Sequence, residues 1–391
     1  RFWKIQQFNL FLSTPLFFKQ MMVTSGGFLT YVASYFTQYF YYPWLGALIF
    51  GLWVSLLMWL TKRTFRIQDK YNALMFIPAV LVVVANMDLG YWHYMLKLRG
   101  YFYAPVIGTS AVLALLWLFR VLPQRFRLPY VVVTAAVGYP LLGAYGLAAV
   151  LLMALWSWRL QGSRTSSAVL SAVALLCIAA IPLLFYRYVY YQTALADAWT
   201  TALPVFILRE PFPLYYIPYG LLLLFLVAMV LCWGISLPER HHGKLRLALN
   251  TLGGFAIFLT VNFWYSDANF HHELRMQHCI ERLDWVGVIK EGTRQQTEPT
   301  RSIVIMHNLA LSRLGRQVED MYNFPKGSAP YATPLPVYTY HIIGRLMYYN
   351  FGLPNECHRI CMEDGVEYGW RPELLQYMAR CALLNGEYNA A

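Results

Sequence analysis

The stretch that decides the fold is WLGALIFGLWVSLLMWL, which runs from Trp44 to Leu60 without a charged residue. A bilayer core about 30 Å thick needs about 20 consecutive apolar residues in a helix, so this run predicts a membrane-spanning helix. Four basic residues follow it directly, at Lys62, Arg63, Arg66 and Lys70. Because loops rich in Lys and Arg face the cytoplasm, we expect this loop inside and residues 1–43 outside.

The composition of the whole chain also indicates a membrane protein. Hydrophobic residues occupy 58% of the 391 positions and charged residues 13%, whereas about 25% of an average soluble domain is charged. Five of the 19 acidic residues precede Ser266 and the others follow it, so the chain is predicted to divide there into a membrane domain and a soluble domain. The net charge of +12 indicates membrane topology rather than nucleic-acid binding, because most basic residues of the membrane domain lie between apolar runs.

Five further apolar runs predict spans at residues 73–86, 106–119, 167–186, 214–237 and 247–265. The segment 129–158 is ambiguous, because it contains Gly138, Pro140, Gly143 and Gly146 near its middle. A tight hairpin of two short helices keeps the basic clusters on both of its sides in the cytoplasm, whereas a single long helix would put the second cluster outside. With the hairpin counted twice, the chain makes eight crossings.

Residues 1–43 contain no Asp or Glu, and polar residues interrupt their apolar runs. We expect interfacial amphipathic helices on the membrane surface, with a spanning helix at residues 8–23 as the alternative. The resulting domains are 1–43, interfacial; 44–265, transmembrane; and 266–391, soluble. The chain starts at Arg1 and ends at Ala391 in the middle of a pattern, so we expect it to be part of a longer polypeptide.

The tail from residue 266 has helical periodicity and four turn-like sequences, LDW at 283–285, LGR at 314–316, FGL at 351–353 and LNGEY at 384–388. Their spacings of 31, 37 and 34 residues are close to the tetratricopeptide period of about 34 residues. The last stretch, MARCALLNGEYNAA at 378–391, resembles that family. The prediction is an all-α protein, a polytopic helix bundle followed by an extracytoplasmic, tetratricopeptide-like helical hairpin domain that is incomplete at its C-terminus.

The best candidate for a site is MDLGYWHYMLKLRGYFYAP, Met87 to Pro105, in the first predicted external loop. Asp88 and His93 are candidate catalytic residues, since a carboxylate can take a proton, and Lys97 and Arg99 could bind a phosphate. A second external loop, residues 187–213, adds three candidate substrate-binding residues: Asp197, Arg209 and Glu210. The alternative is an ordinary interfacial loop, in which aromatic and basic residues are common.

Other polar clusters give weaker signals. His271, His272, His278 and Cys279 have no recognised metal-site spacing, so no metal is predicted and the sequence indicates no cofactor. If the tail is extracytoplasmic, the oxidising surroundings would allow a disulfide between Cys361 and Cys381. Phosphate-loop, dinucleotide-binding and serine-hydrolase motifs are absent from the sequence.

The predicted architecture is similar to that of membrane glycosyltransferases that use lipid-phosphate sugar donors. In those enzymes an acid in the first external loop activates the acceptor. Residues 1–43, which are predicted to lie outside, contain no acid, so Asp88 would have to take this role instead. The segment GGFLTYVASYFTQYFYYPWLGALI at 26–49 also resembles an uncharacterised family of bacterial polytopic inner-membrane proteins. That second resemblance implies no activity, whereas the resemblance to the glycosyltransferases implies membrane lipids and a lipid-linked sugar as ligands.

The alternative function is a membrane-anchored scaffold that binds a partner protein through its helical repeats, since stacked helix pairs form concave binding surfaces. A transporter is disfavoured because few charged residues lie within the predicted spans. No nucleic-acid partner is expected. The expected location is the bacterial inner membrane.

Overall fold

The structure, a computed structural model, describes residues 2–87, 89–160, 163–191, 193–206, 213–234, 267–333 and 338–391, with positions 243, 247–248, 251, 253–254 and 258. Every regular element among these residues is helical, and extended backbone pairs among them at an isolated bridge between Thr300 and Ala329. The all-α class is therefore confirmed for the described part of the chain.

The chain folds into two compact units, each built from separate segments. Unit 1 comprises Arg1–Leu10, Leu89–Lys97 and Tyr265–Ala391, and unit 2 comprises Phe11–Asp88 and Leu98–Trp264. The predicted domains follow one another along the sequence, whereas unit 1 collects two short segments from within the first 100 residues. Side-chain pairs described below hold these segments to the tail.

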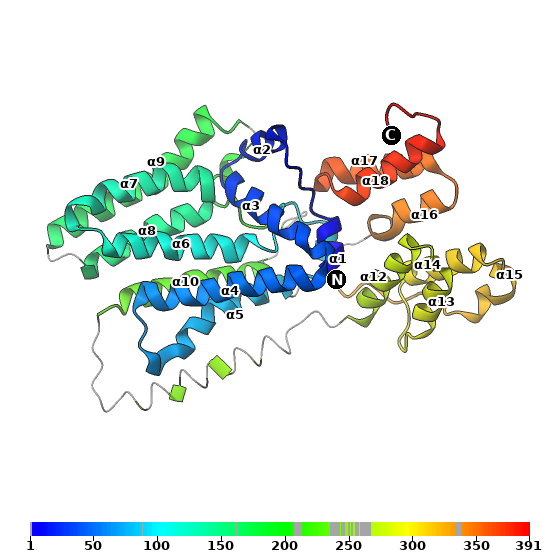
Figure 1. The fold of residues 1–391 in the computed structure, drawn as a ribbon, viewed down its shortest axis with the longest axis horizontal. Helices are drawn as coiled ribbons and strands as arrows, with labels where there is room; N and C mark the ends of the chain where they lie inside the picture. Colours follow the sequence, from blue (N-terminus) through cyan, green and yellow to red (C-terminus); the bar gives the residue numbers. More distant parts are fainter. Residues whose placement is uncertain are drawn as a thin grey trace. The chain divides into compact units, whose positions relative to one another are not determined.

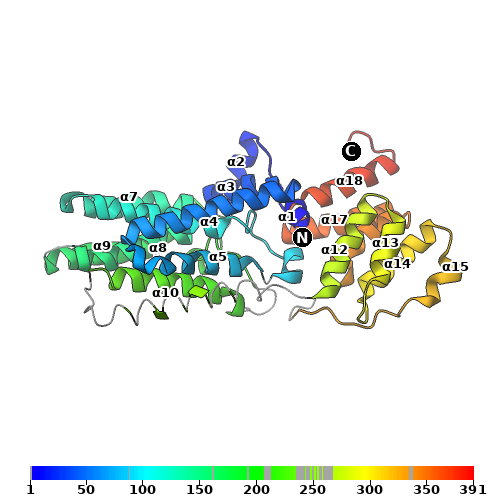
Figure 2. The same ribbon diagram turned by 60° about the horizontal axis from the view of Figure 1, so that its bottom comes forward.

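Unit 2 is a bundle of long helices that lie side by side (Figures 1 and 2). Its described elements are α2 (Pro15–Met21), α3 (Gly27–Thr37), η1 (Gln38–Tyr41), α4 (Pro43–Phe65), η2 (Asp69–Met75), α5 (Phe76–Met87), α6 (Ala104–Val121), α7 (Gln124–Leu142), α8 (Ala144–Leu160), α9 (Arg164–Tyr188), η4 (Leu195–Asp197), η5 (Pro213–Tyr216) and α10 (Ile217–Leu231). Five helical stretches among the described residues are long and apolar enough to cross a membrane: Pro43–Phe65, Asp69–Met87, Ala104–Val121, Arg164–Tyr188 and Pro213–Leu231. They coincide with the spans predicted at 44–60, 73–86, 106–119 and 167–186, and with most of the span predicted at 214–237. Most of the span predicted at 247–265 lies outside the described residues.

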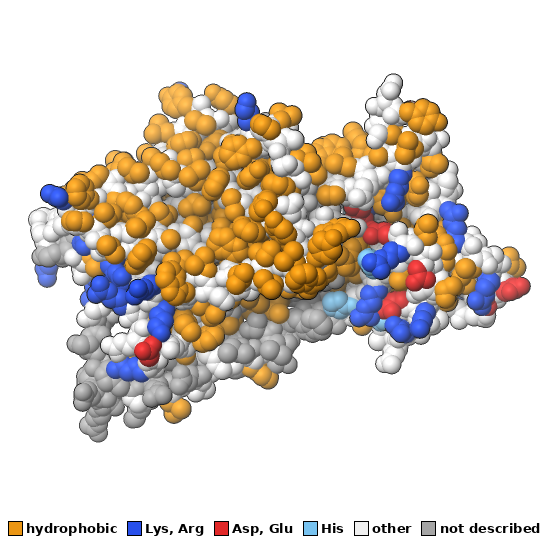
Figure 3. Space-filling model, viewed as in Figure 1, with side chains coloured by type: hydrophobic (Ala, Val, Ile, Leu, Met, Phe, Trp, Pro, Cys, Tyr) orange, Lys and Arg blue, Asp and Glu red, His pale blue; other side chains and the backbone are white. Residues whose placement is uncertain are grey.

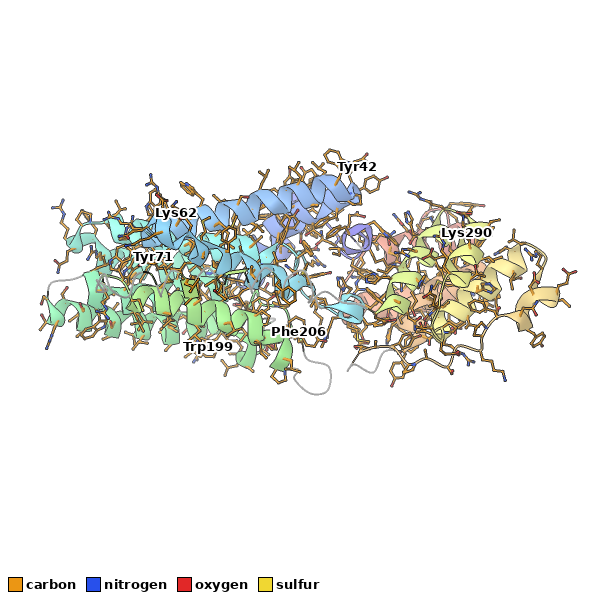
Figure 4. All side chains as sticks on the ribbon, turned by 90° about the horizontal axis from the view of Figure 1, so that it is seen from below. Tyr42, Lys62, Tyr71, Trp199, Phe206 and Lys290 are labelled. Carbon is orange, nitrogen blue, oxygen red and sulfur yellow. The ribbon has the colours of Figure 1, made fainter. Side chains whose placement is uncertain are left out.

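Helix α4 shows how the sequence sets one of these long helices. Pro43 occupies its first turn, where its fixed φ is compatible with a helix, and Lys62 and Arg63 lie in its last turn, where cations stabilise the helix dipole. Its outer face is apolar, since Leu52 is 62% exposed. Hydrophobic side chains cover much of the visible face of this bundle (Figure 3), and Tyr42 and Lys62 mark opposite ends of α4 (Figure 4). Such a surface suits a bilayer and would be an aggregation hazard in water.

The ambiguous segment forms two helices, α7 and α8, which pack against each other and meet at Gly143. Gly143 has a φ of 60°, and a Cβ on Gly146 would lie 2.4 Å from the carbonyl oxygen of Gly138. The predicted hairpin and its close glycine packing are therefore confirmed, and the alternative of one long helix is wrong.

Unit 1 is a set of shorter helices around a buried core. Its described elements are α1 (Phe2–Gln7), η3 (Gly90–Tyr94), α12 (Ala268–Glu281), α13 (Trp285–Thr293), α14 (Arg301–Arg313), α15 (Gln317–Asp320), η6 (Met321–Asn323), the π-helical turn η7 (Tyr340–Gly344), α16 (Arg345–Asn350), α17 (Pro354–Tyr368) and α18 (Pro372–Leu384). Helices α12, α13 and α14 pack in succession, as do α16, α17 and α18 (Figure 1).

Four turns in unit 1 share one hydrogen-bonding pattern. The backbone N–H of Asp284, Arg316, Leu353 and Glu387 each donates to the carbonyl oxygen five residues earlier, at 2.9 Å in every case. The residue before each donor has a positive φ: Leu283, Gly315, Gly352 and Gly386. This is the Schellman arrangement, which satisfies the last carbonyls of a helix. The turns lie where the sequence predicted them.

The first of these turns contains a non-glycine residue in the left-handed region, Leu283, with a φ of 58°. Its side chain is 69% exposed, so little packing compensates for the backbone strain. We expect Leu283→Gly to raise the free energy of unfolding by about 1 kcal/mol, as measured by thermal denaturation of the purified protein.

The matched control is Gly352→Ala, where an added Cβ meets no atom within 4 Å but φ is 77°. That variant should lose about 1 kcal/mol through backbone strain alone. Stabilisation by both variants, or by neither, would contradict this account of the turns.

Candidate functional site

The described candidate residues of the sequence-predicted site are divided between the two units. His93 and Lys97 belong to unit 1, whereas Arg99 and Asp197 belong to unit 2. The other three lie outside the described residues: Asp88, Arg209 and Glu210. The two cavities described below are lined by other residues. The convergence of the set on one site therefore stays a prediction.

His93 lies in the short helical turn η3 and is only 3% exposed. Its Nδ1 is 2.6 Å from the carbonyl oxygen of Gly90, and its ring centre is 6.3 Å from that of Phe270. A ring that is buried and tied to its own turn fixes the conformation of the loop. These surroundings are those of a core residue.

Lys97, Arg99 and Asp197 have different surroundings. Lys97 is exposed, with its Nζ 6.0 Å from the centre of the Tyr368 ring. The Arg99 guanidinium lies 5.5 Å from the Phe17 ring, and burial lowers its pKa. Asp197 is exposed at the end of η4. Lys97 and Asp197 are thus accessible to a ligand, and Arg99 is partly covered.

A buried acid, Glu273 on α12, connects the loop 89–97 to the tail. Its Oε2 lies 3.1 Å from the Tyr91 hydroxyl oxygen, and its Oε1 is hydrogen-bonded to the Thr300 hydroxyl. Glu273 is 0% exposed, and burial raises its pKa to about 8. At neutral pH the carboxyl group is therefore mostly protonated, which removes the cost of burying a charge.

A second buried acid, Glu373 on α18, connects residues 1–10 to the tail. Its two oxygens each lie 2.8 Å from a cation, Oε1 from Lys4 Nζ and Oε2 from Arg345 Nη2. All three side chains are at most 5% exposed. Burial alone would raise the pKa of Glu373, but Arg345 and Lys4 outweigh it and hold that pKa well below its usual range.

Further polar pairs complete the attachment of both segments. Gln7 Nε2 donates to Glu281 at 2.9 Å, and Gln277 Nε2 donates to the Tyr94 hydroxyl at 3.1 Å. Arg371 donates to the Tyr94 carbonyl oxygen at 2.7 Å. Gln7 of α1 and Tyr94 of η3 therefore help to hold both segments to the tail.

Unit 2 contains an apolar cavity of about 360 Å³ between α6, α8, α9 and α10. Its walls are mainly leucine, alanine and aromatic side chains, and its few polar groups include Thr109 and the hydroxyls of Tyr145 and Tyr219. Among the described residues, no acid, base or Cys lines this cavity. Ligand pockets in proteins measure about 300–1,000 Å³, so this cavity falls at the small end of that range.

The segment 198–203 covers one part of this cavity with Trp199 and Leu203. The Trp199 indole donates to the carbonyl oxygen of Ile178 on α9 at 3.0 Å, and Figure 4 shows Trp199 beside α10. The Thr201 hydroxyl accepts a hydrogen bond from Ser25 at 2.6 Å. The segment is thus anchored to both α9 and the loop before α3, and it begins next to Asp197.

Close backbone contact explains the position of this covering segment. A Cβ on Gly26 would lie 2.5 Å from the Cβ of Ala202, and one on Gly143 would lie 2.5 Å from the Thr201 carbonyl oxygen. The glycines therefore let three loops meet at one end of α8. The sequence marked Gly143 as a packing site but gave no sign of the cavity, because cavity-lining and lipid-facing leucines look alike.

Among the described residues, no group of His, Cys, Asp and Glu side chains is arranged to bind a metal ion, the histidine cluster at 271–278 included. His272 pairs instead with Glu291 at 2.9 Å. Cys361 and Cys381 are both buried free thiols in this structure.

Comparison with known proteins identifies the family. A family of unknown function, DUF6057, matches residues 1–391. The chain belongs to this family. No curated protein matches the chain, and no solved structure does.

The buried acid Glu273 predicts a pH dependence. Its pKa of about 8 lies above the ordinary 4.5, so between these values the folded state binds more protons than the unfolded state. The stability that this carboxyl contributes is therefore fully present below pH 4.5 and lost as the pH rises to about 8. Since one pKa unit corresponds to about 1.4 kcal/mol, the loss amounts to a few kcal/mol.

We expect Glu273→Gln to remove this part of the decline, because an amide stays neutral over the whole range. The measurement is the unfolding midpoint of both proteins from pH 5 to 8.5, compared as a difference so that other titrating groups cancel. Parallel curves for the two proteins would contradict the assignment.

Proposed function

We propose that the protein is an integral membrane protein that binds a lipid-linked substrate by its apolar chain, as a glycosyltransferase-like enzyme with a lipid-phosphate donor would. The observation that supports this is the apolar cavity of about 360 Å³ inside the bundle of unit 2. Its helices α6, α9 and α10 belong to stretches long enough to cross a membrane. A ligand reaching it from the bilayer must itself be apolar.

The chemistry of a transfer would have to come from residues outside the cavity walls. An acceptor hydroxyl needs a carboxylate to take its proton, and a departing phosphate needs cations. Asp197 lies two residues before Trp199, next to the cavity, and is a candidate for the carboxylate. Asp88, Arg209 and Glu210 remain candidates from the sequence. On this proposal, that end of the bundle faces the outer leaflet of a bacterial inner membrane.

A photoreactive isoprenyl phosphate tests the lipid proposal. Irradiated with the purified protein, the probe should label peptides of α8 and α10, and an excess of unlabelled isoprenyl phosphate should suppress the labelling. We expect Ala148→Trp, which fills the cavity, to reduce labelling at least tenfold.

The matched control is Leu176→Trp on α9, a position 67% exposed on the bundle surface, which should leave labelling unchanged. If a two-chain phospholipid competes as well as isoprenyl phosphate does, the site is an ordinary lipid crevice and the proposal fails. Labelling that survives Ala148→Trp would also contradict it.

A second candidate function is that unit 1 serves as a protein-binding scaffold. The specific observation in its favour is the set of four turns with one hydrogen-bonding pattern, at residues 283, 315, 352 and 386. A repeated turn between helix pairs is what a tetratricopeptide-like array requires. We propose that unit 1 is such an array, that it lies outside the cytoplasm, and that it binds a partner protein.

A further inference from the structure

Unit 1 has a groove of about 330 Å³ between α14 and the start of α16. One wall carries Arg301 and Ile305, which lie four residues apart and therefore on one face of α14. The other wall carries Tyr338, Tyr340 and Met347. The groove thus lies between two helices, with mainly apolar walls and a cation, Arg301, among its described lining residues.

Among the described lining residues, Arg301 is the one that carries a formal charge. Its side chain is exposed, and in the described part of the chain no salt bridge involves it. By contrast, the buried cations Lys4 and Arg345 share Glu373 within the same unit. Arg301 therefore offers a guanidinium fork that matches a carboxylate from outside the unit.

The opposite wall is built on a π-helical turn, η7, which is uncommon and often lies at functional sites. Beneath it, His341 Nδ1 is 2.9 Å from Asp364, and Arg345 donates to the His341 carbonyl oxygen at 3.0 Å. Above it, the rings of Tyr338 and Tyr340 stack at 5.6 Å and remain 54% and 41% exposed. The turn therefore presents a fixed aromatic surface to the groove.

The charge is distributed unequally across the groove. Three acids of α17 act on the Tyr340 hydroxyl: Asp364, Glu367 and Glu363. Asp364 is paired with His341 and Glu363 with Arg359, so the repulsion of a carboxylate near Tyr340 comes mainly from Glu367, whereas a carboxylate near Arg301 would be attracted. The groove thus distinguishes the two ends of an occupant.

We propose that this groove between α14 and α16 binds a peptide segment of a partner protein, with an acidic side chain on Arg301 and apolar side chains between Ile305, Tyr340 and Met347. The inference rests on the proposal that unit 1 binds a protein. An anionic membrane surface is the weaker match, because it requires a cluster of basic residues, whereas the described lining residues of the groove include a single basic residue, Arg301.

Three pools of fluorescein-labelled octapeptides test the inference. The pools share the same random apolar positions and differ at two fixed positions, which are Glu, Gln or Lys. Binding to the full-length protein in detergent micelles is followed by fluorescence anisotropy. We expect the Glu pool to bind at least tenfold more tightly than the Gln pool, and the Lys pool to bind most weakly.

Arg301→Glu should reverse the order of the Glu and Lys pools, and Tyr338→Ala should weaken the Glu pool about tenfold. Both changes are compatible with folding, since Glu suits the first turn of a helix and Tyr338 precedes η7. Arg282→Glu, an exposed position at the end of α12 with the same charge change, should leave all three affinities unchanged.

Each outcome supports or overturns a separate claim. If the Gln pool binds as tightly as the Glu pool, or if Arg301→Glu leaves the order unchanged, the acidic-peptide site is overturned while peptide binding by unit 1 stands. If none of the pools binds the wild-type protein, the proposal that unit 1 binds a protein fails as well.

Discussion

The ion pairs of Glu373 with Lys4 and Arg345 are the interaction on which the organisation of unit 1 depends. The three residues come from α18, α1 and α16, and Lys4 and Glu373 are 369 positions apart in sequence. Burying any one of these charges alone would be unfavourable, and removing one partner of a buried pair typically costs about 3–5 kcal/mol. The tail therefore needs residues 1–10 to complete its own core.

The loop 89–97 is tied to the tail through a different chemistry. Glu273 is kept neutral by burial and shares its oxygens with Tyr91 and Thr300, while Tyr94 is held by Gln277 and Arg371. The chain consequently passes between the two units at residues 10, 88, 97 and 264. A helical unit that incorporates two segments from the first 100 residues is structurally dependent on them.

Local patterns in the sequence predicted much of this architecture. The charge-free run at 44–60 predicted α4, and the glycines around 143 predicted the hairpin, because span length and turn conformation depend on neighbouring residues. The turns at 315, 352 and 386 were visible for the same reason. The turn at LDW, 283–285, was also predicted, but not that Leu283 would take its positive φ, because a leucine rarely adopts that conformation.

The pairing of distant residues was not visible. His93 looked like a member of a site in an external loop because it lies among aromatic and basic residues, and the structure buries it together with Tyr91 and Tyr94. Their partners in the tail have no periodic relation to them, so no spacing rule could have identified Glu273 or Arg371. The apolar cavity of unit 2 and the groove at Arg301 are likewise products of packing between helices.

Native-state hydrogen exchange tests the central claim, that residues 1–10, 89–97 and 267–391 form one cooperative unit. Amides of α1, η3 and the tail helices should open together, with one common free energy and one common response to denaturant. Faster exchange of α1 or η3, with the tail helices still protected, would contradict the account, because the tail would then be stable without the two segments.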